Sequence, residues 1–140
     1  MTFEVLISCM YQKGFSIIHA SQLEKVKATI INQTDIAQDT WFNDEKGHKR
    51  LDTKTRGLSV SRNMAVNAAE SDICLICDDD ECFVDGLEEK VLSAYRDYPD
   101  ADMICFMLDC PEIIMPRKAK KINYITALKI VSWQISFWRD

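Results

Sequence analysis

The chain has 140 residues, the length of one ordinary domain, and 47% of them are hydrophobic, which is enough to bury a core and argues against disorder. Its formal net charge of −5 excludes non-specific nucleic-acid binding, because that activity needs a basic surface. No basic N-terminal segment precedes an apolar one, so we expect no signal peptide and predict a cytoplasmic protein whose six cysteines are reduced thiols.

The first half of the chain alternates between apolar and polar stretches. Residues 4–10 and 27–32 are rich in β-branched and other apolar side chains, which predicts two strands. The apolar spacing in residues 15–23 predicts a short amphipathic helix between them. Residues 39–52 are polar and locally basic, so we expect a loop whose cationic side chains, like that of the nearby Arg56, are solvated. Neither histidine has a partner that the sequence identifies, so neither is predicted to be catalytic.

A second helix is predicted to begin at Ser59, because serine is a favourable N-cap residue. Val60, Met64 and Ala68 recur at a four-residue spacing, beside Ala65 and Ala69, which predicts one face whose small alanines pack closely on the sheet. Arg62 lies in its first turn. We expect Arg62 either to reach the acidic residues beyond the next strand, or a ligand phosphate, or to be a surface cation.

The most regular pattern is an unbroken apolar run over residues 73–77, followed by four acidic residues at 78–81. Such a short run is typical of a strand that is buried on both faces in the middle of a parallel sheet. Together with the order of the other elements, it predicts an α/β fold with a largely parallel sheet. Open sheets of this kind bind ligands at the carboxyl ends of their strands, which is where the acidic residues lie.

The acidic residues predict a divalent-metal site. On an extended backbone Asp78 and Asp80 point to the same side, with their Cα atoms roughly 6.5 Å apart. Carboxylates this close repel one another, and a hard cation such as Mg²⁺ or Mn²⁺ relieves the repulsion. A solvated acidic turn is an alternative of similar weight. Cys74 and Cys77 have the spacing of half a zinc motif, but they point to opposite faces of a strand and cannot share a metal.

The pattern predicts less in the last part of the chain. A helix is expected after Asp85, with Glu88 completing a capping box. Its buried stripe is predicted to comprise Leu87, Val91, Tyr95 and Tyr98. Residues 102–108 predict an apolar strand. Residues 122–138 are apolar without a clean period and contain polar side chains, so they predict neither a defined element nor a membrane span.

The stretch RGLSVSRNMAVNAAESDICLICDDDECFVDGLEEKV resembles glycosyltransferase family 2. Members of that family have an Arg-Asn helix, a short spacer and an apolar strand that ends in an Asp-x-Asp-Asp-like motif. These correspond here to Arg62-Asn63 and to residues 78–81, and Tyr11 matches a tyrosine at the end of the family's first strand. The resemblance implies the GT-A fold, a Rossmann-like three-layer sandwich with a mainly parallel central sheet.

The resemblance also implies a metal-dependent enzyme that transfers a sugar, with inversion, from a nucleotide-diphospho-sugar to an acceptor hydroxyl. The acceptor would be a glycan, a lipid-linked molecule or another hydroxyl compound, and a lipid-linked acceptor would bring the protein to the inner face of the membrane. The residues implied to bind the nucleotide-sugar are Met10, Tyr11, Asn32, Asp35, Arg62, Asp78 and Asp79. The residues implied to hold the metal, Mn²⁺ or Mg²⁺, are Asp78 and Asp80, and no catalytic residue is identified.

The chain departs from the family pattern in two respects. Its second strand ends in Asn32-Gln33, where the family usually has an acidic pair that reads the nucleobase, so the base is not identified. The chain is also shorter than typical members. We therefore expect residues 1–140 to form a single nucleotide-sugar-binding domain that is truncated at its C-terminus, with residues 111–140 beginning the acceptor side.

Three other functions remain open from the sequence. One is a nucleotide-binding module that is catalytically incomplete. Another is a phosphorylation-controlled signalling receiver, which also places carboxylates and Mg²⁺ at strand ends but needs an acidic pair after its first strand, where residues 9–11 have none. The third is an α/β domain whose acidic turn is only solvated.

Overall fold

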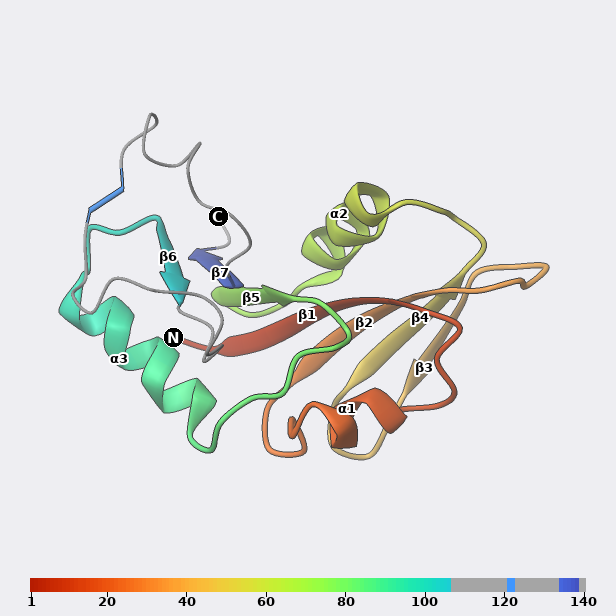
Figure 1. Ribbon diagram of the computed structural model, residues 1–140, viewed down its shortest axis with the longest axis horizontal. Coiled ribbons are helices and arrows are strands. Elements are labelled where there is room, and N and C mark those ends of the chain that lie inside the picture. The colour runs from red at the N-terminus through yellow and green to blue at the C-terminus, as the bar shows by residue number, and fades with distance from the viewer. Residues whose placement is uncertain (107–120, 123–133, 139–140) are drawn as a thin grey trace.

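The computed structural model describes residues 1–106, 121–122 and 134–138, the last of these as backbone only. Helices and strands alternate along the chain, as Figure 1 shows. In order they are β1 (Phe3–Met10), α1 (Ser16–Ala20), β2 (Ala28–Gln33), β3 (Thr40–Asn43), β4 (Lys49–Thr53), α2 (Leu58–Ala68), β5 (Ile73–Cys77), α3 (Leu87–Asp97), β6 (Met103–Phe106) and β7 (Gln134–Trp138).

The described strands form one sheet in the order β3-β4-β2-β1-β5-β7-β6. The four central strands, from β4 to β5, run parallel, whereas β3 and β7 are antiparallel to their neighbours. This arrangement confirms the predicted α/β class with a mainly parallel central sheet. It also confirms that β5 is an internal strand, since β1 pairs with one side of it and β7 with the other.

The sheet lies between helices on both faces, with α2 on one side and α1 and α3 on the other (Figure 1). The alternation of β1 explains these layers, because Val5 and Ile7 enter the core beneath α1 and α3 while Leu6 enters the core beneath α2. Fully burying one such side chain contributes about 1.5–3 kcal/mol. In the part of the chain that the structure describes, no helix is long and apolar enough to cross a membrane.

The prediction of a loop over residues 39–52 is wrong, because this stretch contains β3 and β4, paired as an antiparallel hairpin. The charge of Arg50 contributed to the wrong prediction, because this residue is buried in β4. Its guanidinium carbon lies 4.6 Å from the centroid of the Phe42 ring and 5.5 Å from that of Phe15, and its Nε lies 3.0 Å from Oδ1 of Asp52. Aromatic and ionic partners therefore replace the apolar side chain that the strand pattern would normally show.

The start of α2 and the outer edge of its predicted face also differ from the prediction. Its N-cap is Gly57, whose φ of 105° favours glycine, and no side chain caps the helix, so Ser59 lies inside the first turn. The buried residues of the helix are Ser61 and Ala65, whereas Val60 is 44% exposed. Ala65 and Ala69 are buried as predicted, and Met64 and Ala68 are half-buried, so only the outer edge of the predicted face, at Val60, is exposed.

The helix α3 begins after Gly86, a left-handed residue with φ 73°, and no side chain caps it, so the predicted Asp85 capping box is absent. Val91 and Tyr95 are buried as predicted, but Tyr98 lies past the last helical residue and is exposed. The first helix, α1, is shorter than predicted. The predicted strand over residues 102–108 is described only from Met103 to Phe106, and most of the predicted acceptor-side region, residues 111–140, lies outside the described residues.

The hairpin turn between β3 and β4 is held by Asp44. Its Oδ1 accepts the backbone N–H groups of Lys46 and His48, each at 2.9 Å, and its Oδ2 lies 2.6 Å from Nδ1 of the buried His48 ring. The other ring nitrogen, Nε2, lies 3.1 Å from the Val26 carbonyl oxygen, which can only accept. Both ring nitrogens therefore lie beside an acceptor, which fixes the orientation of the imidazole ring.

We expect Asp44→Asn to destabilise the fold by about 1 kcal/mol at neutral pH, since a charged acceptor is lost. Partial burial raises the pKa of Asp44, but the hydrogen bonds from His48 outweigh it and hold the pKa below the ordinary 3.8. A depressed folded pKa gives stability that is present above 3.8 and disappears as pH falls through the folded value. Urea unfolding across this range should show the wild-type advantage shrinking in acid, with Asp100→Asn as an exposed control. A pH-independent difference would contradict the ionic role.

Candidate functional site

The predicted site residues gather at the edge of the sheet where the parallel strands end. The chain passes from β1 to β2 on one side and reaches β5 on the other side only much later. A crevice forms between strands at such a reversal of order, and open α/β sheets bind their ligands there. Met10 ends β1 and Asp78 follows β5, so the two flank the place where this crevice is expected.

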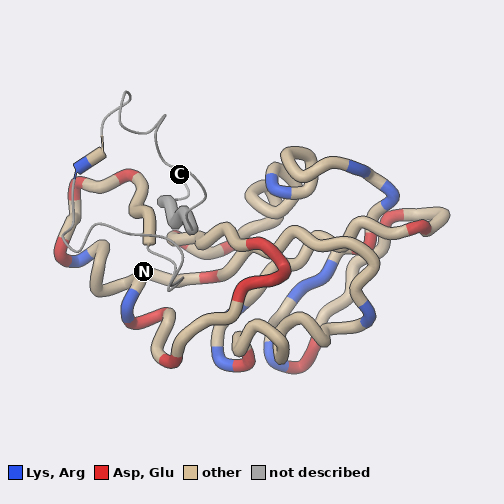
Figure 2. Tube along the Cα trace, in the orientation of Figure 1, with Lys and Arg blue, Asp and Glu red and all other residues tan. Residues whose placement is uncertain are grey.

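The acidic residues 78–81 form a turn directly after β5, visible as a continuous red stretch in Figure 2. The strand ends at Cys77, and Asp79 and Asp80 form the turn, so the extended backbone predicted over residues 78–80 is wrong. The backbone N–H of Asp78 donates to Oε2 of Glu81 at 3.1 Å, which closes the turn. A turn points successive carboxylates in different directions, whereas a strand would have aligned alternate ones.

One carboxylate of the turn contacts α2, the helix that packs on β1 and β2. Nη2 of Arg62 donates to Oδ1 of Asp78 at 2.6 Å, so the predicted contact between this arginine and the acidic residues is present. Its neighbour Asn63 is exposed. Nε of Arg62 is buried and has no hydrogen-bond partner among the described residues. A buried donor without a partner carries a desolvation cost that a ligand oxygen would relieve.

The charge of Asp79 acts on the thiols of β1 and β5. Burial, followed by the charge of Asp79, raises the pKa of the Cys9 thiol to about 12. Burial and the acidic turn likewise raise the pKa of Cys77 well above its ordinary value. Both thiols therefore stay protonated at neutral pH, which makes them poor nucleophiles. Cys74 and Cys77 belong to the cores on opposite faces of the sheet, as the strand prediction requires.

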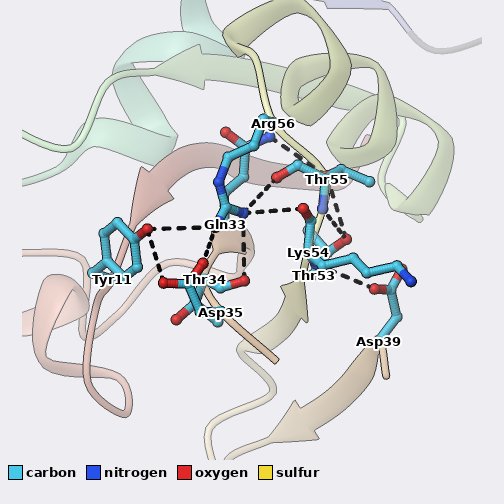
Figure 3. A network of polar contacts seen from close by, with 9 residues as sticks. All are labelled: Tyr11, Gln33, Thr34, Asp35, Asp39, Thr53, Lys54, Thr55 and Arg56. Carbon is cyan, nitrogen blue, oxygen red and sulfur yellow. Dashed lines mark hydrogen bonds and ion pairs between the residues drawn. The ribbon is translucent and has the colours of Figure 1, made fainter. Parts of the chain in front are cut away.

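On the other side of β1, Figure 3 shows Tyr11, Asp35 and Arg56 pointing toward one another. The Tyr11 hydroxyl donates to Oδ2 of Asp35 at 3.2 Å, Arg56 forms an ion pair with Asp35, and the guanidinium carbon lies 5.8 Å from the centroid of the Tyr11 ring. Tyr11 has a φ of 54°, in the left-handed region, and 55% of its surface is exposed. Strained backbone and exposed aromatic surface together are typical of a ligand site.

Arg56 is the member of this group that the sequence did not single out, because it was assigned to a solvated basic stretch. Its Nη1 donates to the carbonyl oxygens of Lys54 at 3.1 Å and Thr55 at 2.9 Å, so the loop before α2 holds the guanidinium in place. No sequence signal identifies it, since Asp35 and Tyr11 are 21 and 45 residues away in the chain.

Asn32 and Asp52 lie opposite one another in β2 and β4, and Asn32 bonds to the residue that follows Tyr11. Nδ2 of Asn32 donates to the Gln12 carbonyl oxygen at 3.0 Å and to Oδ1 of Asp52 at 2.8 Å, and its Oδ1 accepts the Gln12 N–H at 2.9 Å. Both amide hydrogens are thus used within the protein, and the residue is 1% exposed. Asn32 holds the segment after β1 against β2 and β4. Met10, by contrast, is 46% exposed at the end of β1.

The acidic turn offers the hard oxygen donors that Mg²⁺ or Mn²⁺ prefers. Within residues 1–106 and the shorter described segments, no group of three or more His, Cys, Asp or Glu side chains is placed to hold a metal ion. Mg²⁺ is usually bound by one or two carboxylates together with the phosphates of a substrate. Asp80 is exposed and Asp78 is half-exposed, so these donors fit a cation that a ligand's phosphates also hold.

Comparison with protein families gives a match to the family described as Glycosyl transferase family 2, over residues 29–133. The matched segment contains β2, α2, β5 and the acidic turn, and it spans more than half of the chain. Comparisons with curated proteins and with solved structures give no match.

Proposed function

The chain belongs to glycosyl transferase family 2, and from this premise we propose that it binds a nucleotide-diphospho-sugar at the carboxyl edge of its sheet and transfers the sugar to an acceptor hydroxyl with inversion. The observation that carries the proposal is the ion pair of Arg62, on α2, with Asp78, directly after β5. Glycosyl transfer is the activity of the family in general. The donor contacts, the metal and the stereochemistry are our proposal.

The nucleobase would stack on the exposed ring of Tyr11. Beside that ring, Asp35 supplies an acceptor and Arg56 supplies donors. This combination complements a base edge on which an imino N–H lies next to a carbonyl oxygen, as in uracil and guanine. In the same orientation, cytosine and adenine would place an unprotonated nitrogen against the Asp35 carboxylate and an amino group against the Arg56 guanidinium. The proposed donor is therefore a uridine or guanosine diphospho-sugar.

The diphosphate would lie between Arg62 and the acidic turn. The buried Nε of Arg62 offers a free donor to a phosphate oxygen, and Asp79 lies beside the end of β1, where Met10 borders the crevice. Asp78 and Asp80 would hold Mn²⁺ or Mg²⁺, which when bound neutralises charge on the diphosphate. Arg62 has two partners in this arrangement and orients Asp78 toward the ligand.

In the transfer step an acceptor oxygen bonds to the anomeric carbon while the bond from that carbon to the diphosphate oxygen breaks. The diphosphate leaves with the electron pair, and a carboxylate takes the proton of the acceptor hydroxyl. We assign this base to none of the described residues. The acceptor class is a glycan, a lipid-linked molecule or another hydroxyl compound, and we propose that the reaction takes place in the cytoplasm, for a lipid-linked acceptor at the inner face of the membrane.

Titration calorimetry with the diphosphates of uridine, guanosine, cytidine and adenosine, each with Mn²⁺ and with a chelator, tests the proposal. We expect uridine or guanosine diphosphate to bind at least about tenfold more tightly with Mn²⁺, which corresponds to about 1.4 kcal/mol. Cytidine and adenosine diphosphates should bind more weakly. Equal binding of all four with and without metal would refute the site. Metal-dependent binding without any sugar release from the matching donor would favour a binding module that is catalytically incomplete.

A further inference from the structure

A hollow of about 330 Å³ lies away from the donor edge and has no role in the proposed reaction. Its lining comes from the hairpin, the end of α2 and the segment that follows α2. The lining residues are Trp41, Asn43, Lys49, Ala68 and Glu70. Since Trp41 pairs with Leu51, which packs in the core beneath α2, the hollow opens on the α2 side of the sheet edge.

Trp41 is the main apolar surface of this hollow. It lies on β3, the edge strand, whose four residues are all exposed, and 46% of its own surface is accessible. A tryptophan side chain usually buries most of its large surface, so an indole left open beside a hollow is an unused stacking surface.

Polar groups of both kinds surround the indole. Asn43 lies opposite Lys49 in the hairpin and brings an amide that can donate and accept. Glu70 accepts from Nζ of Lys27 at 2.9 Å and from Nζ of Lys49. Hydrogen bonds from Lys49, and to a smaller extent from Lys27, lower the pKa of Glu70 to about 2. The carboxylate is therefore ionised and held in place, and it can accept further hydrogen bonds.

We propose that this hollow is a carbohydrate-binding site in which a neutral pyranose ring stacks on Trp41 while its hydroxyls bond to Asn43, Lys49 and Glu70. A pyranose has an apolar C–H face and a rim of hydroxyls that donate and accept, which matches an indole ringed by polar groups. A purely apolar ligand would leave those groups unpaired, which is costly. A phosphate would need a free cation, and Lys27 and Lys49 are both paired with Glu70. The volume is at the small end of ligand pockets and suits a single ring.

The position of the site suggests what it holds. Trp41 lies on β3, opposite Leu51 in the middle of β4, whereas the donor crevice lies beside β1. Three strand spacings separate β3 from β1, which is roughly 14 Å. A sugar on Trp41 is too far away to react, but it can anchor an oligosaccharide or polysaccharide acceptor whose other units reach the donor edge. This role rests on glycosyl transfer, and it does not depend on the metal site or on the choice of nucleobase.

Affinity electrophoresis of the full chain in gels that contain soluble glucan, galactan, mannan or chitin oligosaccharides tests the inference without a nucleotide. At least one glycan should retard the wild-type chain. Trp41→Ala should weaken that binding at least tenfold, Trp41→Phe should retain part of it, and Glu70→Gln should weaken it. Tyr98→Ala, which removes an exposed aromatic ring elsewhere, is the matched control and should bind like the wild type.

Two further measurements separate the possible outcomes. Circular dichroism establishes that each variant is folded, and Trp41→Phe tests the site if Trp41→Ala does not fold. Calorimetry with a nucleoside diphosphate and Mn²⁺ should give the same affinity for Trp41→Ala as for the wild type, so failure of the donor site is recognised separately. Absence of retardation by every glycan, or equal retardation of the wild type and both Trp41 variants, would overturn the inference.

Discussion

Asp80→Asn is expected to weaken the Mn²⁺-dependent binding of a nucleoside diphosphate by at least about tenfold, or about 1.4 kcal/mol. The substitution keeps the size of the side chain but removes a charge from the acidic turn. Asp80 is exposed and, unlike Asp78, is not paired with Arg62, so it is the carboxylate most available to a cation. Calorimetry with uridine or guanosine diphosphate and Mn²⁺ measures the loss.

Asp85→Asn is the matched control, because it removes the same charge from an exposed aspartate five residues further along the chain. It should bind the nucleotide like the wild type. In the chelator, the Asp80 variant should match or slightly exceed the wild type, since one carboxylate fewer then repels the diphosphate. If both variants lose affinity equally, the effect comes from the general negative potential, and Asp80 is not a metal ligand.

The local pattern was sufficient to predict those features whose cause lies within a few residues. The run over residues 73–77 has no polar break, and such a run is stable only where both faces are covered, so β5 was predictable as an internal strand. The short spacer between the helix and that strand also brings Arg62 back to the residues after the strand, where it meets Asp78.

Features that depend on partners far along the chain were not predictable. Arg50 is charged and its strand was predicted as a loop, because the Phe15 ring beside its guanidinium lies far away in the chain. The same holds for the donor edge, where Arg56 meets Tyr11 across 45 residues. The predicted N-caps of α2 and α3 are wrong for a different reason. Glycines with positive φ precede both helices, in place of the side-chain caps that the sequence predicted.

Substitution of Glu4 is expected to cause the largest loss of stability. Glu4 is charged, so the sequence alone did not predict that it is buried. It lies in β1 and is 0% exposed. Its Oε1 accepts the backbone N–H groups of Glu70 at 2.5 Å and Ser71 at 2.6 Å, and its Oε2 accepts the Thr29 hydroxyl at 2.8 Å. One carboxylate therefore satisfies three donors and fastens the segment between α2 and β5 to the amino end of the sheet.

Glu4→Ala would leave those donors without an acceptor and open a cavity, so we expect it to lower the free energy of unfolding by about 3–5 kcal/mol. Glu4→Gln should lower the free energy of unfolding by less, because its remaining oxygen still accepts hydrogen bonds. Some loss remains, because the new amide N–H₂ group faces donors. Urea unfolding measures both, and Glu88→Ala, an exposed position in the first turn of α3, is the control and should change the free energy by less than about 0.5 kcal/mol. Losses below about 1 kcal/mol for both Glu4 variants would mean that solvent or a rearranged backbone satisfies these donors. Nucleotide affinity of the folded Gln variant should equal that of the wild type, because Glu4 lies at the opposite end of β1 from the donor crevice.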